Sequence, residues 1–302
     1  MIQVLIQLSP IFLLFLFGLG MRRFGFADNS CGNRYLKVVV NIAFPLLVFT
    51  SVSRISLTSD LLLLPLLAMA TVVVVGVLAY GAGRLMALEK SQLGVLLTGA
   101  MVMNLAFLYP FVSVAWGEKA LGSLILLDFG NALLVLTLVY ALACVFGKGV
   151  GPIGRQVGKG LLSFPPLWAL LLALVVNVLG IPLPDQGLDM LSDLAQLLMF
   201  LVPYSLGLYF SLQGVAWLPV AVGLVLRSGL GLALGLSWVM LFDLQGLEAA
   251  VVILACAAPV GFNSLVYAVR EGLDARYAAT QASLSVLLGM IYVPVLMWLL
   301  KV

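Results

Sequence analysis

Long apolar runs recur along the whole chain and are separated by short polar connections. Most of these runs continue for about 18 residues or more almost without charge, which is long enough for a helix to cross a bilayer. The apolar residues follow one another without interruption, whereas a strand of an outer-membrane barrel alternates apolar and polar positions over about 10 residues. The pattern therefore predicts an all-α membrane protein.

Ten membrane helices fit the apolar runs. They are Ile2–Met21, Leu36–Val52, Leu61–Gly83, Gln92–Trp116, Ala120–Phe146, Pro165–Leu179, Leu188–Leu212, Leu218–Phe242, Leu247–Val269 and Ala275–Leu300. The longest polar stretch, Gly147–Ser163, falls between the fifth helix and the sixth. We therefore expect a first five-helix repeat over residues 1–147, a cytoplasmic linker over 148–163 and a second, inverted five-helix repeat over 164–302.

Prolines recur at corresponding places in the two halves. The pairs are Pro10 with Pro166, Pro45 with Pro203, Pro65 with Pro219 and Pro110 with Pro259, and their members are 149 to 158 residues apart. Coincidence is the alternative, because the chain has 13 prolines. The spacing favours an inverted repeat, which is typical of secondary transporters whose substrate site lies near the bilayer midplane.

The fourth and ninth helices contain residues that interrupt helices. The fourth reads GAMVMNLAFLYPF with Asn104 and Pro110, and the ninth reads CAAPVGFNSLVYAV with Pro259, Gly261 and Asn263. Proline removes a backbone donor and kinks or breaks a helix. In hydrocarbon the freed carbonyls are tolerated only where they line a protein cavity. The helical rise places both interruptions near the bilayer centre, where two helix breaks would present their ends to a ligand.

Four polar side chains inside the spans are further candidates. Asp128 marks an ion or proton path or anchors a neighbouring helix, since a buried acid is unfavourable in lipid. Asn131 follows one turn later on the same face and could share that site. Three roles stay open for Arg227: pairing with Asp128, attracting an anionic substrate, or reaching the cytoplasmic surface. Asn41 either contacts substrate or hydrogen-bonds a neighbouring helix.

Composition excludes several other classes of protein. Hydrophobic residues make up 64% of the chain and charged residues 9%, with a mean hydropathy of +1.22, so no soluble domain is expected. Histidine is absent, which removes Ser-His and Cys-His nucleophiles and the HExxH metal motif. Three widely spaced cysteines predict neither disulfides nor a metal site. An intramembrane aspartyl protease needs two buried acids, and Asp128 is the only acid well inside an apolar run. The chain has no basic cluster that would support nucleic-acid binding. We expect no enzyme and no cofactor.

The positive residues predict the orientation. Eleven of the 15 Lys and Arg residues lie in loops after odd-numbered helices, and three lie on the opposite side. Because Lys and Arg favour the cytoplasm, the linker should be cytoplasmic and both termini periplasmic, in the plasma or inner membrane.

Four segments resemble the auxin efflux carrier family, in its short-loop bacterial form. They are NIAFPLLVF, NLAFLYPF, LLDFGN and AAPVGFNSLVYA, in the second, fourth, fifth and ninth helices. The resemblance implies a scaffold domain of helices 1, 2, 6 and 7 and a transport domain of helices 3–5 and 8–10. Helices 4 and 9 would cross at their breaks, as in NhaA-type antiporters and bile-acid symporters. Asn104 and Asn263 match the family residues that hold the substrate carboxylate.

The function expected is elevator-type secondary transport of a small organic anion. The resemblance favours a carboxylate or dicarboxylate such as malonate or malate, or an auxin-like acid. Asp128 and Asn131 are the candidates for coupling to a proton or a sodium ion. A sodium-coupled symporter of the bile-acid type and a channel of similar fold are the alternatives. The partners expected are the substrate and the lipid bilayer, and a homodimer stays open.

Overall fold

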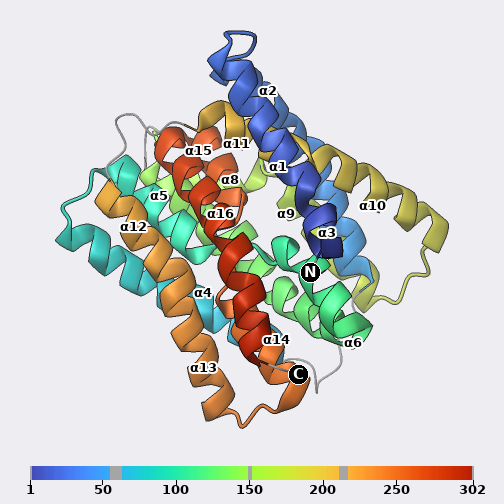
Figure 1. Cartoon of the computed structure of the whole chain (residues 1–302). Coiled ribbons are helices and arrows are strands. Elements are labelled where there is room, and N and C mark those ends of the chain that lie inside the picture. Colours follow the sequence, from blue (N-terminus) through green and yellow to red (C-terminus); the bar gives the residue numbers. More distant parts are fainter. Residues whose placement is uncertain (1, 55–62, 149–151, 211–216, 301–302) are drawn as a thin grey trace. The chain divides into compact units, whose positions relative to one another are not determined.

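The computed structural model describes residues 2–54, 63–148, 152–210 and 217–300, and every element in these ranges is a helix (Figure 1). The helices form two compact units. Unit 1 comprises residues 1–9, 59–148 and 211–302, and unit 2 comprises residues 10–58 and 149–210. Each unit therefore combines a segment from the first half of the chain with one from the second.

Unit 1 is built around two short helices, α5 and α14, that are buried over most of their length. Its elements, with π-helical segments labelled η, are α4 (Leu63–Leu85), α5 (Lys90–Met101), α6 (Leu105–Leu134), η3 (Val135–Val139), α7 (Tyr140–Phe146), α12 (Trp217–Leu224), η4 (Val225–Leu230), α13 (Gly231–Leu241), α14 (Gly246–Cys256), α15 (Asn263–Glu271) and α16 (Ala275–Leu300). All residues from Leu93 to Met101 and from Ala250 to Cys256 are buried. A helix that is apolar and buried on every side lies in the interior of a bundle.

Unit 2 contains the remaining helices. They are α1 (Ile2–Arg23), of which residues 10–23 belong here, α2 (Asn29–Val38), η1 (Val39–Ala43), α3 (Phe44–Ser53), α8 (Ile153–Leu162), α9 (Pro165–Val178), α10 (Asp185–Met199) and α11 (Leu201–Tyr209). Close backbone approach joins α1 to α11. A Cβ atom on Gly18 would overlap the Tyr204 carbonyl, and one on Gly207 would overlap the Phe15 carbonyl.

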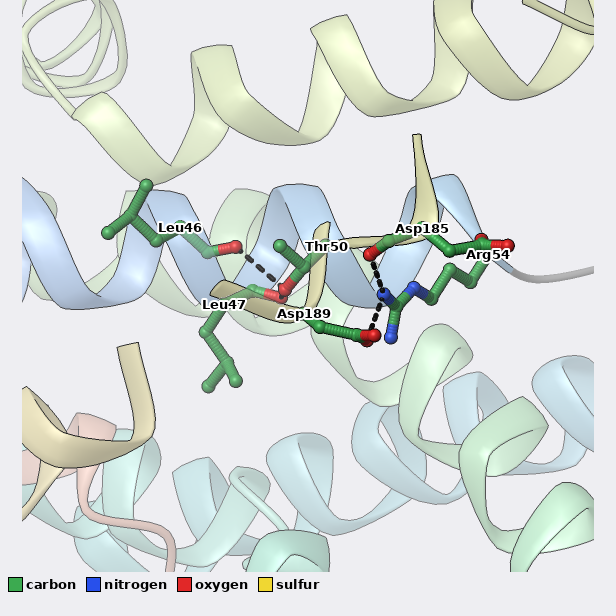
Figure 2. Close-up of polar contacts among 6 residues, drawn as sticks. All are labelled: Leu46, Leu47, Thr50, Arg54, Asp185 and Asp189. Carbon is green, nitrogen blue, oxygen red and sulfur yellow. Dashed lines mark hydrogen bonds and ion pairs between the residues drawn. The ribbon is translucent and has the colours of Figure 1, made fainter. Parts of the chain in front are cut away.

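A polar contact joins α10 to the C-terminal end of α3 in unit 2 (Figure 2). The Arg54 Nη2 atom donates to the Asp189 carboxylate at 2.6 Å and to the Asp185 carbonyl at 3.4 Å. One turn earlier, the Thr50 hydroxyl donates back to the Leu46 carbonyl at 2.9 Å. Both charged side chains are largely exposed, so this ion pair contributes at most about 1 kcal/mol.

Several helices are long and apolar enough to span a membrane. Within the described ranges, the continuous helical segments of this kind are Leu63–Leu85, Ala120–Phe146, Trp217–Leu241 and Ala275–Leu300. Two shorter apolar helices are Pro165–Val178 and Gly246–Cys256. Large apolar side chains such as Val77, Met240 and Trp298 are exposed, as lipid-facing residues are. The chain is thus an all-helical, multi-pass membrane protein.

The predicted boundaries differ from the helices in informative places. The tenth predicted span coincides with α16, and glycine at φ +77° (Gly117) separates the fourth and fifth spans inside α6. The fourth and ninth spans are each divided into two helices, α5 and α6, and α14 and α15. The predicted linker contains the helix α8. The predicted ends at Leu61 and Leu212 lie outside the described residues.

Candidate functional site

The two broken helices of unit 1 meet at their breaks. Helix α5 ends at Met101 and α14 ends at Cys256, and the chain that follows each runs non-helically before the next helix begins. These connections form an antiparallel pair. The Asn104 amide donates to the Pro259 carbonyl at 2.9 Å, and the Gly261 amide donates to the Val102 carbonyl at 3.0 Å. We refer to residues 102–104 and 257–262 together as the crossover.

Side chains from two other helices complete the hydrogen bonding of the crossover. Asn131 of α6 accepts from the Met103 amide at 3.3 Å and donates to the Met103 carbonyl at 3.2 Å. Ser285 of α16 accepts from the Val260 amide at 2.8 Å. Met103 and Val260 are the bridged pair, so each half of the crossover receives a side-chain partner. Non-helical backbone inside a membrane protein is stable only when its polar groups are satisfied in this way.

Asp128 lies one hydrogen bond away from the crossover. Its carboxylate accepts from the Asn131 amide at 3.2 Å, and its side chain is half-buried. The predicted sharing of one face of α6 by Asp128 and Asn131 corresponds to this contact. A change of charge at Asp128 would therefore act on the residue that clamps Met103.

The two asparagines expected at the substrate site have different surroundings. Asn104 is buried and is the N-cap of α6, where its side-chain oxygen accepts from the Phe107 amide at 3.3 Å. Its amide nitrogen lies 3.5 Å from the Val260 carbonyl oxygen, a weak contact. Asn263 is half-exposed at the start of α15, and no residue in the described part of the chain hydrogen-bonds to its side chain.

The backbone pairing also fixes which residues of the two halves correspond. Asn104 donates to the Pro259 carbonyl as Gly261 donates to the Val102 carbonyl, so Asn104 corresponds to Gly261. By the same register Asn263 corresponds to Ala106, which is exposed between two buried neighbours. The accessible positions beside the crossover are therefore Ala106 and Asn263, one at the N-terminal end of each following helix.

Only one of the two expected prolines lies at a break. Pro259 is part of the crossover, and a Cβ atom on Gly289 of α16 would lie 2.6 Å from its Cγ. Pro110 lies within α6, six residues after the break. The expectation that the fourth helix breaks at its proline is therefore wrong. Helix α5 ends because Val102 and Asn104 pair with the opposite segment and Asn104 caps the next helix.

Arg227 is held inside unit 1. Its side chain is 0% exposed, so it does not reach the surface as one of the three readings supposed. It hydrogen-bonds to backbone carbonyls at the ends of α5 and α14, and no ion pair joins it to Asp128 or to another acid in the described part of the chain. Attraction of an anion stays a prediction for this residue.

A groove of about 360 Å³ opens beside the crossover. Its polar lining residues are Ser228, Ser285 and Tyr292, and its apolar walls are Leu224, Val225, Gly229, Leu288 and Ile291. The Tyr292 hydroxyl donates to the Ala257 carbonyl at 2.8 Å and lies 2.9 Å from the Ser228 hydroxyl. Because these hydroxyls already have hydrogen-bond partners, the groove suits an apolar group better than a carboxylate.

Asn41 lies apart from these residues in the chain. It belongs to η1 in unit 2, and its side chain is exposed. Its role as a substrate contact or a helix partner stays a prediction. In the described ranges, no group of three or more His, Cys, Asp or Glu residues is placed to hold a metal ion.

Sequence reasoning did not select Ser285, Tyr292 or Gly289 as parts of the site. The signal in the sequence was a run of polar residues on an otherwise apolar helix, and the structure buries all of them: Thr280, Gln281, Ser283 and Ser285 of α16. Buried polar side chains in a membrane helix indicate contacts to other helices.

Comparison with known proteins finds similarity to membrane transport proteins. The profile of a family described as membrane transport protein matches residues 3–297. An uncharacterized transporter of Methanothermobacter thermautotrophicus is 32% identical over 276 residues, which cover 89% of this chain and 88% of that relative. An uncharacterized transporter of Methanocaldococcus jannaschii is 26% identical over 302 residues, covering 96% of each chain.

Proposed function

This chain belongs to the membrane transport protein family, that of the auxin efflux carriers, and is a transporter and not an enzyme; we propose that it is a secondary carrier of a small organic anion. The expected substrates are a carboxylate or a dicarboxylate such as malonate or malate, or an auxin-like acid.

The crossover of unit 1 is the observation on which this proposal rests. Helices α6 and α15 both begin there, so the positive ends of two helix dipoles lie beside one another. Backbone N–H groups and a helix N-terminus favour an anion. Asn263 adds an amide without a partner in the described residues, and Asn104 adds a second amide from the opposite segment. These donors suit a carboxylate group.

The division into two units supports an elevator mechanism. Unit 1 contains the helices that the family resemblance assigns to a transport domain, and unit 2 contains most of those that it assigns to a scaffold. The proposal includes ten membrane helices in two inverted five-helix repeats. Five helices in each half are what the apolar runs of the sequence predict, and the antiparallel pairing of the two breaks supports an inverted repeat.

Asp128 is the proposed coupling residue. It is the acid that contacts the crossover through Asn131, and its protonation would remove a charged acceptor from that amide. A sodium-coupled symporter is the second candidate of similar fold. Sodium sites in such carriers use unwound backbone carbonyls, but the crossover carbonyls of Val102, Met103 and Pro259 already accept hydrogen bonds. Proton coupling is therefore the form we propose.

Uptake by purified protein in liposomes tests the proposal. Radiolabelled malonate and malate should enter with saturable kinetics and exchange against internal substrate, which a channel would not show. Asn104→Ala combined with Asn263→Ala should reduce uptake to that of empty liposomes. Asp128→Asn should transport without dependence on an imposed pH gradient. Full activity in the double variant would disprove the assigned site, and an unchanged pH dependence would disprove the coupling role.

A further inference from the structure

A single guanidinium group joins the ends of the two central helices of unit 1. Arg227 Nη1 donates to the carbonyls of Ala100 at 3.0 Å and Met101 at 3.4 Å, at the C-terminal end of α5. Its Nη2 donates to the Cys256 carbonyl at 2.5 Å, at the C-terminal end of α14. The side chain is 0% exposed, so both ends are bound by one buried cation.

The charge of this group matches what the two helix ends lack. The C-terminal end of a helix carries about half of a negative elementary charge from its unpaired carbonyls. Two such ends lie within reach of one arginine side chain, and together they present about one negative charge. A guanidinium carries one positive charge spread over a planar fork, and can therefore donate to both ends at once.

The surrounding backbone is shaped to admit this side chain. Arg227 lies in the π-helical segment η4, and such segments often occur at functional positions. A Cβ atom on Gly231 would overlap the Cys256 carbonyl and would lie 2.7 Å from Arg227 Nη2. Glycine at this position lets η4 and α13 approach the end of α14 closely enough for the guanidinium to reach it.

The hydrogen bonding of Arg227 indicates a role toward the helix ends rather than toward an acid. Its Nε atom is buried and has no partner among the described residues, and no carboxylate forms an ion pair with it there. A buried cation without an acid is very unfavourable unless other groups offset its desolvation. The carbonyls at the two helix ends are the groups that do so.

We propose that Arg227 is a positioning residue that serves as the built-in cation of the crossover. It occupies the place that a bound cation would otherwise take between the ends of α5 and α14, and it holds the two half-helices together. Removing its side chain then leaves a cavity that recruits guanidinium ion from solution. This inference concerns the same crossover as the proposed function, but its test needs no knowledge of the substrate.

Thiol labelling of Cys256 provides a readout at the site itself. Cys256 is 0% exposed and its carbonyl accepts from Arg227, so a reagent reaches its thiol only when this region opens. Cys31→Ser and Cys144→Ala first remove the other two thiols. In this background, Arg227→Ala should increase the labelling rate of Cys256 by at least about tenfold, because charged hydrogen bonds at the helix ends are lost.

Chemical rescue separates a cation site from a merely structural role. Millimolar guanidinium chloride, far below the molar concentrations that unfold proteins, should slow labelling of Arg227→Ala saturably toward the rate of the parent protein. Tetramethylammonium chloride, a cation without N–H donors, should not. Arg227→Met keeps an apolar stem that fills the cavity, and its labelling should be fast and insensitive to guanidinium.

Two results would overturn the inference. One is slow, parent-like labelling in Arg227→Met, since the charge would then be unnecessary. The other is an equal response of the alanine and methionine variants to guanidinium. If Arg227→Ala does not fold, Arg227→Lys decides the matter: it keeps the charge and should label more slowly than Arg227→Met, and equal rates would refute the proposal. Failed uptake in the parent protein would count against the proposed substrate and leave these labelling results intact.

Discussion

At the scale of single residues, three asparagines near the crossover differ in the hydrogen bonds of their side chains. Asn131 clamps Met103 through both of its amide atoms, and Asn104 caps α6. Asn263 has no such partner among the described residues and is half-exposed. Asn131 thus has both side-chain atoms in hydrogen bonds, Asn104 keeps its amide nitrogen in only a weak 3.5 Å contact, and Asn263 has both atoms available to a ligand.

This difference predicts that stability and affinity separate between Asn104 and Asn263. Asn263→Ala should raise the KM for the carboxylate at least about tenfold, as loss of a hydrogen bond to a charged group does, while the Tm stays unchanged. Asn104→Ala should lose about 1 kcal/mol of stability, because the N-cap is lost. Asn104→Ser is the matched control, since serine still caps a helix but has no amide. Thermal unfolding and uptake kinetics measure the two effects, and a large Tm loss in Asn263→Ala would contradict this assignment.

At the scale of helices, packing in unit 1 depends on positions where a side chain is missing. A Cβ atom on Gly130 of α6 would overlap the Pro65 carbonyl of α4, and the two helices therefore touch through backbone. Gly122, on the same helix, has nothing within 4 Å of a Cβ atom built there. Close packing of α6 against α4 therefore requires glycine at position 130, whereas it does not require glycine at position 122.

Gly130→Ala and Gly122→Ala should therefore have opposite effects on stability. The first should destabilise the protein by about 1–3 kcal/mol, because the backbone of α4 must move to accept a methyl group. The second should be neutral or stabilise by up to about 1 kcal/mol, since alanine favours helix more than glycine does. Thermal unfolding in detergent measures both, and equal stabilities would show that α4 and α6 do not approach as closely as described.

A helix cap outside the apolar runs shows how local chemistry sets an element boundary. Asp28 precedes α2 and accepts hydrogen bonds from the Ser30 hydroxyl at 2.6 Å and from the Cys31 amide at 3.1 Å. These bonds, that of the Ser30 side chain foremost, lower the pKa of the Asp28 carboxyl below its usual 3.8. Because the folded-state pKa is lowered, the cap is complete above pH 3.8 and is lost as the pH falls through the lower folded value.

At the scale of the whole molecule, each unit draws on both halves of the sequence. Unit 1 joins residues 59–148 to residues 211–302, and unit 2 joins residues 10–58 to residues 149–210. A carrier that moves one unit past the other would expose the crossover alternately to the two sides of the membrane. Such a movement would depend on the assembled units and on no single helix.

Alternating access predicts that one position is labelled from either side. In a variant without native cysteines, Ala106→Cys would place a thiol at the exposed start of α6. Impermeant maleimides added outside should label this thiol in right-side-out vesicles and also in inside-out vesicles. Saturating substrate should slow the labelling in both. Arg155→Cys, in the linker, is the control and should react from the cytoplasmic side alone. Labelling of Ala106→Cys from one side irrespective of substrate would argue against an elevator.

The sequence by itself determined the class of protein and which two spans, the fourth and the ninth, are interrupted. Apolar character is a local property of each segment, so continuous apolar runs predicted α16 to its ends and an all-helical membrane protein. Four short motifs, two of which contain Asn104 and Asn263, were sufficient to recognise the family.

Only the tertiary structure decided where α5 ends and what Arg227 does. The break of α5 depends on backbone bonds between Asn104 and Pro259 and between Val102 and Gly261, partners in opposite halves of the chain. Arg227 acquires its role from carbonyls at two helix ends, groups that every residue carries and that no sequence pattern distinguishes. Such non-local backbone contacts exist only after the helices have packed, which is why apolar patterns and proline positions did not predict them.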